Sequence, residues 1–149
     1  MSADLEWMQA ALAEARAAGE AGEVPIGAVV VFEGKIIAAG QNSVLRRLDP
    51  TAHAEIVAMR EAAHTIGNYR LLGCTLYCTL EPCAMCAGAL IHARVGRLVY
   101  AAPDPKAGAC GSVLSVLNHP QLNHQMQVER GIGGEESAEL LRNFFRDRR

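Results

Sequence analysis

The sequence is poor in aromatic residues and has no dominant charge of either sign. Phe, Trp and Tyr make up 5% of its 149 residues, and the formal net charge is −2 with a pI near 6.2. Such a balance provides no overall positive field for nucleic acid, so a polynucleotide partner would have to be bound by a local basic patch. No run approaches the ~20 apolar residues that span a bilayer, and the acidic start of the chain is unlike a signal peptide. We therefore expect a cytoplasmic protein with no membrane partner.

Disulfides are not expected either. The chain has five cysteines, an odd number, and no export signal, which is typical of reduced thiols in a cytoplasmic protein. A chain of this length suits one domain, here residues 1–149, which buries roughly 70% of its unfolded surface and needs neither disulfides nor metal to close its core. The cysteines are therefore interpreted as metal ligands or core residues.

Apolar periodicity and turn residues predict alternating helices and strands. The first helix carries apolar residues at three- and four-residue spacing and ends near Gly19 and Gly22; these residues are Leu5, Met8, Leu12 and Ala15. Glu33-Gly34 separates two apolar runs, which is typical of a β-hairpin. Thr51 is the predicted N-cap of a helix at 52–66, and Pro82 suits the first turn of a helix at 83–92.

The rest of the chain continues this alternation. Strands are predicted at 25–32, 35–42, 74–80, 95–102 and, weakly, 126–130, with polar loops at 46–51 and 104–112 and a terminal helix at 135–149. Because helix and strand alternate from residue 52 onward, the fold class predicted is α/β, with three layers.

The segment Pro82-Cys83-Ala84-Met85-Cys86 carries the clearest chemical signal. Two thiols at positions i and i+3 lie on one helical face and can bind one ion, and a helix N-terminus favours the thiolate that a metal needs. His53 opens the other helix, and helix N-termini gather at the carboxyl ends of strands in such folds, so residues 53 and 83 can meet. Three ligands with a free fourth position describe a catalytic zinc site. Glu55 is then placed to move the proton of a reacting water.

Other interpretations of these residues stay open. The metal set could be a structural site or unrelated core thiols, Glu55 a solvated first-turn glutamate, and Asn42 a plain turn residue. Arg46 and Arg47 could be solvated or could contact RNA. The remaining histidines, His64, His92, His119 and His124, are expected at the surface or in the core, and Cys74, Cys78 and Cys110 are expected to be buried.

The C-terminal helix offers the clearest local basic cluster, Arg142, Arg146, Arg148 and Arg149. These arginines could contact phosphates or could interact with the negative end of the helix. Phe144 and Phe145 are consecutive, so both cannot face inward, and one is expected to point to solvent or ligand.

The combination of His-x-Glu with Pro-Cys-x-x-Cys is a signature of zinc deaminases, and the chain resembles the cytidine deaminase-like superfamily. The flanking segments TAHAEIVAMR, NYRLLGCTLYCTLEPCAMCAGALIHAR, DPKAGACGS and FFRDRR resemble bacterial tRNA-specific adenosine deaminases over nearly the whole chain. The resemblance implies a three-layer α/β/α fold around a mixed sheet of about five strands. It also implies conversion of adenosine to inosine at the wobble position of an arginine tRNA with an ACG anticodon, by a homodimer with one Zn²⁺ per subunit.

The same resemblance assigns roles to residues. His53, Cys83 and Cys86 match the family's zinc ligands, and Glu55 matches the group that carries protons from water to ring N1 and to the departing ammonia. The residues that match substrate contacts are Asn42 at the purine edge, Ala54 beside the flipped base, Asp104 and Lys106 in a loop that touches the RNA, and Phe145 beside the anticodon loop.

Two other functions remain to be weighed. A deaminase of a free base, such as guanine or cytosine, would share the same signature, and the flanking resemblance and the basic tail favour RNA. A non-catalytic, zinc-stabilised binding module is the other alternative, which Glu55 argues against because a structural site needs no proton carrier.

Overall fold

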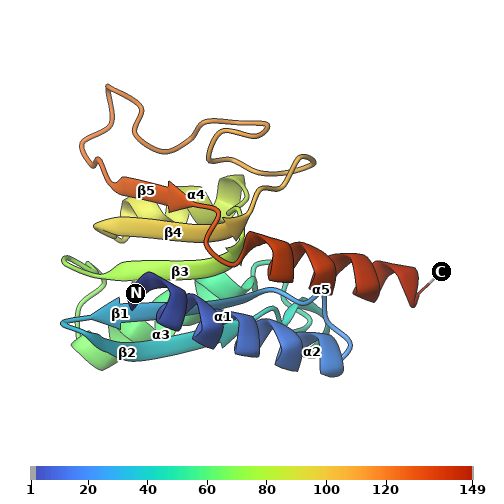
Figure 1. The fold of residues 1–149 in the computed structure, drawn as a ribbon. Coiled ribbons are helices and arrows are strands. Elements are labelled where there is room, and N and C mark those ends of the chain that lie inside the picture. Colours follow the sequence, from blue (N-terminus) through green and yellow to red (C-terminus); the bar gives the residue numbers. More distant parts are fainter. Residues whose placement is uncertain (1–2, 149) are drawn as a thin grey trace.

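The computed structural model describes residues 3–148 and consists of a five-stranded mixed sheet with helices on both faces (Figure 1). The strands are β1 (Gly27–Phe32), β2 (Lys35–Gln41), β3 (Thr75–Leu80), β4 (Arg97–Ala102) and β5 (Gln127–Arg130), in the order β2-β1-β3-β4-β5. Strand β1 is antiparallel to both of its neighbours, whereas β3, β4 and β5 are parallel to one another. The predicted α/β class and mixed sheet are confirmed.

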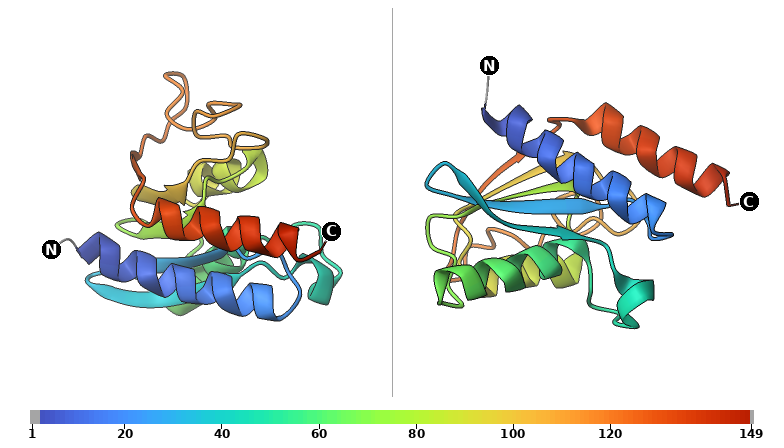
Figure 2. Two further views of the ribbon diagram at one scale, coloured as in Figure 1. Left: turned by 45° about the vertical axis from the view of Figure 1, so that its right-hand side comes forward. Right: turned by 90° about the horizontal axis from the view of Figure 1, so that it is seen from below.

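The helices form the two outer layers. Helices α1 (Ala3–Glu20) and α5 (Gly134–Arg146) lie side by side on one face, and α3 (Ala54–Ile66) and α4 (Ala84–His92) cover the other (Figure 2). An ion pair between Arg16 and Glu136 joins α1 to α5. The short helix α2 (Val44–Arg47) lies in the connection between β2 and α3. No helix within residues 3–148 is both long and apolar enough to cross a membrane.

Alternation along the strands divides the core between the two faces. In β1, Val30 packs in the cluster under α3 and α4, whereas Val29 packs in the cluster under α1. Strand β3 repeats the pattern with Leu76 and Tyr77. Because both faces of the sheet are covered, the central strands are almost continuously apolar, as is typical of buried sheets.

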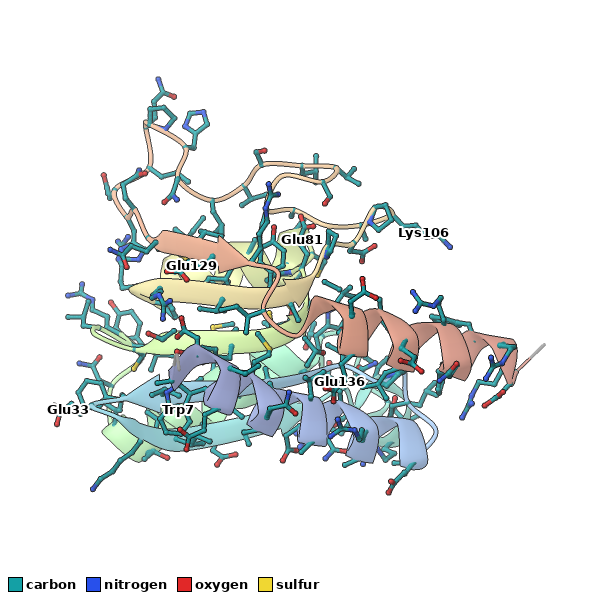
Figure 3. All side chains as sticks on the ribbon, viewed as in Figure 1. Trp7, Glu33, Glu81, Lys106, Glu129 and Glu136 are labelled. Atoms are coloured by element: carbon teal, nitrogen blue, oxygen red, sulfur yellow. The ribbon has the colours of Figure 1, made fainter. Side chains whose placement is uncertain are left out.

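The hairpin predicted at Glu33-Gly34 is present. Both turn residues have positive φ angles, 50° and 75°, which is typical of the type I′ turns that match the twist of paired strands. The turn lies at the opposite end of the sheet from Lys106 (Figure 3).

Two predicted helix starts are wrong by one or two residues. Thr51 is not the N-cap of α3, because its hydroxyl and N–H both donate to Asp49 Oδ1 in a local turn, and His53 occupies the cap position. Pro82 lies outside α4, because Cys83 is extended (φ −76°, ψ 178°) and is itself the N-cap. The loop predicted at 46–51 also overlaps α2. These shifts place His53 and Cys83 at equivalent positions, each directly before the first turn of a helix.

The topology brings these two helix starts together. Strand β2 runs in the same direction as β3 and β4, since β1 is antiparallel to both of its neighbours, so the chain leaves all three at one end of the sheet. Gly40 lets α3 approach β2 closely, because a Cβ at this position would lie 2.4 Å from the Ala54 carbonyl oxygen. The first turn of α3 is thereby held directly against the sheet.

Candidate active site

His53, Cys83 and Cys86 form a compact cluster at the N-termini of α3 and α4. The Nδ1 atom of His53 lies 3.5 Å from Cys83 Sγ and 3.6 Å from Cys86 Sγ. All three donor atoms lie within 4.8 Å of one another. The structure therefore confirms that residues 53 and 83 meet.

The donor set and its spacing fit a tetrahedral metal. Zinc bonds of about 2.3 Å to sulfur and about 2.0 Å to nitrogen, at tetrahedral angles, place such atoms about 3.6 Å apart. The two His53–cysteine distances agree with this value. Two thiolates and an imidazole are the ligands that zinc prefers over magnesium or calcium. The cluster can hold a metal ion with three protein ligands and leave one position for another molecule.

The electrostatics of the cluster favour an added positive charge. Contacts with the Cys86 thiol and the His53 ring hold the pKa of Cys83 at about 3, so this sulfur is a thiolate at neutral pH. The same contact, together with burial, raises the pKa of Cys86. The hydrogen bond to Cys83 raises the pKa of His53. A thiolate thus attracts positive charge at this point.

Glu55 lies in the first turn of α3 and is almost completely buried, with 4% of its surface exposed. Burial raises the pKa of its carboxyl, against smaller opposing contributions from its own backbone N–H and from His53. His53 and Glu55 both lie at the start of α3, and both line the same pocket. The carboxyl of Glu55 is therefore shielded from solvent next to the cluster, and Glu55 is not a solvated residue of the helix surface.

A pocket of about 140 Å³ lies beside the cluster. It is lined by Ile26, Asn42, His53, Ala54, Glu55, Leu80, Glu81, Cys83, Asp104 and Ala107. Asn42 is 8% exposed, and its Oδ1 atom has no hydrogen-bond partner. A buried acceptor without a partner is costly, so this atom is suited to a donor supplied by a ligand. Asn42 thus lines the pocket and carries a buried acceptor without a partner.

A wider groove of about 960 Å³ lies next to this pocket and shares three of its lining residues, Ile26, Leu80 and Asp104. The groove runs between the 103–106 segment and α5, and Lys106, Arg142, Phe145 and Arg146 are part of its lining. Phe145 is 52% exposed, whereas Phe144 is only partly exposed and lies under the Arg148 guanidinium. One of the two phenylalanines therefore faces outward, as the sequence predicted. Arg149 lies outside the described residues.

Glu81 is a residue of this site that sequence reasoning missed. Its buried carboxylate accepts hydrogen bonds from the backbone N–H groups of Asp104, Cys110 and Ser112, at 2.9 to 3.1 Å, and from the Ser112 hydroxyl. These donors outweigh the effect of burial, so the pKa of Glu81 is lowered. A Cβ on Gly108 would lie 2.4 Å from Glu81 Cδ. Glu81 therefore anchors the 104–112 loop beside the pocket, at the end of the sheet where Lys106 also lies (Figure 3).

The remaining histidines and cysteines do not extend the cluster. Within residues 3–148, His53, Cys83 and Cys86 are the group of three or more potential ligands that lies close enough to hold a metal. His124 instead contacts the Val95 carbonyl at 2.6 Å. Cys74 and Cys78 are buried as predicted, but Cys110 is only half-buried because it lies in the loop that Glu81 anchors.

The fold and the site together define a deaminase. The chain belongs to the MafB19-like deaminase family, whose model matches residues 2–149. The tRNA-specific adenosine deaminase of Agrobacterium fabrum is 48% identical over 149 residues, which is 100% of this chain and 98% of that protein. The enzyme of the same name from Haemophilus influenzae is 48% identical over 98% of this chain and 85% of its own length. The resemblance to tRNA-specific adenosine deaminases that the sequence indicated is thereby confirmed.

Solved structures give the same result. A structure from studies of A-to-I editing by tRNA:A34 deaminases at the wobble position of transfer RNA superposes with a TM-score of 0.88 at 48% identity, covering 91% of this chain and 99% of that one. A guanine deaminase from Nitrosomonas europaea superposes with a TM-score of 0.80 at 30% identity, covering 97% and 85%. The fold is thus shared with a free-base deaminase, but the similarity to the tRNA deaminase is greater in both measures.

Proposed function

We propose that this protein deaminates adenosine to inosine at the wobble position of a tRNA anticodon, in an arginine tRNA of the ACG type. The observation that carries the proposal is that two spaces lie next to each other: a small pocket beside the metal-binding cluster shares three lining residues with a much larger groove. The small pocket suits one extruded base, and the groove offers room for the nucleotides on either side. A free-base deaminase would need only the first.

His53, Cys83 and Cys86 are the proposed ligands of one Zn²⁺ per subunit. Support comes from their sulfur and nitrogen donors and from the thiolate on Cys83. When bound, zinc supplies Lewis acidity, which makes water a stronger acid near neutral pH. The other steps fall to the side chains around the pocket.

Glu55 is the proposed proton carrier. In the overall reaction, water adds to C6 of adenine and the bond from C6 to the amino nitrogen breaks, which yields inosine and ammonia. Glu55 takes the first proton from water and gives it to ring N1, then moves the proton of the new C6 hydroxyl to the departing amino group. Its place in the pocket lining with Asn42 and Ala54 supports this role. Asn42 binds the purine edge, and the Ala54 backbone lies beside the base.

The RNA around the target adenosine is proposed to lie in the groove. Asp104 and Lys106 come from the loop anchored by Glu81, and Phe145 projects an exposed ring that can stack on a base. Arg142 and Arg146 supply positive charge on the same side of the groove. These residues form the local basic patch that a slightly acidic chain needs in order to bind RNA.

The active form is proposed to be a cytoplasmic homodimer of one-domain subunits, each spanning residues 1–149. An apolar groove of about 380 Å³ between α3 and α4 supports the dimer, because the exposed Tyr69 and the partly exposed Ala63, Ala89 and Ala93 line it. Exposed apolar surface of this kind commonly marks a protein interface.

The test uses the purified zinc-loaded protein and measures product by mass spectrometry. We expect inosine to form in an anticodon stem-loop with ACG, and no turnover of free guanine, cytosine or cytidine. A stem-loop in which guanosine replaces the target adenosine is the matched control. Turnover of a free base without turnover of the stem-loop would refute the proposal in favour of the free-base alternative.

A further inference from the structure

Glu23 is a buried charge far in sequence from the pocket. It lies in the segment between α1 and β1 and is 1% exposed. Its carboxylate accepts the backbone N–H of Leu45 at 3.0 Å, the backbone N–H of Arg46 at 2.9 Å and the Arg46 Nε–H at 3.0 Å. A carboxylate removed from water needs such partners, so Glu23 is committed to these contacts.

These contacts stabilise α2, which is too short to be stable on its own. Helix α2 has four residues, and its N-cap residue Ser43 makes no side-chain capping bond. The Ser43 hydroxyl donates instead to the Gln41 carbonyl at 2.8 Å. The first N–H groups of a helix have no partner within the helix, and a single turn is unstable in isolation. Glu23 therefore caps α2 from another part of the chain.

Arg46 extends the same contacts to Asn42. Its terminal Nη2 donates to the Asn42 backbone carbonyl at 2.9 Å and to Gln41 Oε1 at 3.0 Å. The Asn42 backbone N–H donates in turn to the Ile26 carbonyl at 3.0 Å, and its side-chain Nδ2 contacts the Val24 carbonyl at 3.4 Å. Asn42 is thus held between the 23–26 segment and the start of α2. The Glu23–Arg46 ion pair links these two segments to each other.

Asn42 is the point at which this arrangement meets the pocket. Its Oδ1 atom is buried, has no hydrogen-bond partner, and belongs to a side chain that lines the small pocket with His53 and Glu55. The contact from Nδ2 to Val24 turns the oxygen of the carboxamide away from that carbonyl. A shift of the backbone at residue 42 would move this acceptor, and small displacements at a recognition atom are costly in catalysis.

We propose that Glu23 and Arg46 are positioning residues that hold the Asn42 carboxamide against the base in the pocket. The inference rests on the proposed function and adds two residues to it. Arg46 then acts through its contacts with Glu23 and Asn42, and not as a phosphate ligand. Neither residue touches the reacting atoms.

A double-mutant cycle tests this inference. Arg46→Lys keeps the charge but lacks the fork that reaches Glu23 and Asn42 together, and Glu23→Gln removes the charge that pairs with Arg46. We expect each to lower kcat on the stem-loop about tenfold while KM stays within about twofold. In an Asn42→Ala background, the same changes should lower kcat by less than about twofold, because their target is gone. Arg47→Lys, on the same short helix, is the matched control and should stay within about twofold in both backgrounds.

Two results would overturn the inference. Full, additive losses in the Asn42→Ala background would show that the pair acts elsewhere. A rise in KM that depends on salt, without a fall in kcat, would show that Arg46 contacts a phosphate.

A second measurement is independent of turnover. In protein labelled with ¹⁵N-asparagine, Arg46→Lys should shift or broaden the NMR signals of the Asn42 side-chain amide, and Arg47→Lys should leave them unchanged. Unchanged signals in Arg46→Lys would contradict the inference even if the protein proved inactive on the stem-loop. An inactive wild type with the expected NMR change would refute the proposed function alone.

Discussion

Glu55 and Glu81 are two glutamates at the same end of the sheet, and both are buried, with 4% and 2% of their surface exposed. Glu81 is surrounded by four donors from the 104–112 loop, and its pKa is lowered. Glu55 lies beside the His-Cys-Cys cluster, and burial raises its pKa. The carboxyl with a full set of donors is held ionised and organises a loop, whereas the other can gain and lose a proton.

Of the substitutions that test this comparison, the removal of the Glu55 carboxyl should lower the activity most. Glu55→Ala is expected to keep its zinc but to lower kcat by about 10³-fold, because proton transfer would lose its carrier. Zinc content by atomic absorption and single-turnover inosine formation check both parts. Glu61→Ala, an exposed glutamate on the same helix, should stay near wild type. Turnover retained in Glu55→Ala would refute the proposed role of Glu55 as proton carrier.

Removal of a metal ligand should be almost as severe but should differ in kind. Cys83→Ala is expected to lose bound zinc and with it most of the activity, because two ligands cannot complete the site. Cys110→Ala removes a cysteine outside the cluster and should bind one zinc per subunit. The same loss of activity on chelation of the wild type, restored by added zinc, would support the assignment. Full zinc occupancy in Cys83→Ala would contradict it.

Replacement of Glu81 should affect stability more than chemistry. Glu81→Ala leaves three backbone N–H groups of the loop without their acceptor, and we expect a loss of about 2–3 kcal/mol in the free energy of unfolding. The activity should fall less than in Glu55→Ala. Urea unfolding measures the change, and Glu20→Ala, at an exposed helix end, should differ by less than about 0.5 kcal/mol. Equal stability of Glu81→Ala and wild type would remove the proposed distinction between the two glutamates.

The smallest expected effect is a pH-dependent contribution of Glu23 to the free energy of unfolding. Burial would raise its pKa, but the N–H groups of Arg46 and Leu45 and the Arg46 side chain lower it below the ordinary value of 4.5. Its contribution to stability should therefore be complete above about pH 4.5 and be lost as the pH falls through the lower folded-state value. The difference in unfolding free energy between wild type and Glu23→Gln should shrink over that acidic range. A difference that stays constant with pH would mean that the Glu23 charge contributes nothing.

Much of the fold was predictable because its signals are local. The hairpin at Glu33-Gly34 follows from turn chemistry, and the alternation of helix and strand follows from apolar periodicity. The cap positions were not predictable at the same precision. Thr51 has the right side chain for an N-cap, but Asp49 lies two residues before it and binds the same hydroxyl and N–H. Local competition between two good turn residues decided that helix start.

The candidate site was predictable to different degrees. His53, Cys83 and Cys86 could be proposed together because few residue types bind zinc and their motif spacing is specific. Glu23 and Glu81 carried no such motif. One signal was available for Glu81, a charged residue directly after a buried strand, but its partners lie more than 20 residues away in a loop.

The sequence by itself determined the chemistry of this protein: which donors can bind a metal, which carboxyl stands beside them, and which family the chain resembles. The tertiary structure alone decided which buried glutamate has a raised pKa and which two are anchors, and it separated Arg46, held by Glu23, from Arg47. The reason is physical. Side-chain type and local spacing are encoded along the chain, but the pKa and role of a buried charge depend on donors brought to it from distant segments.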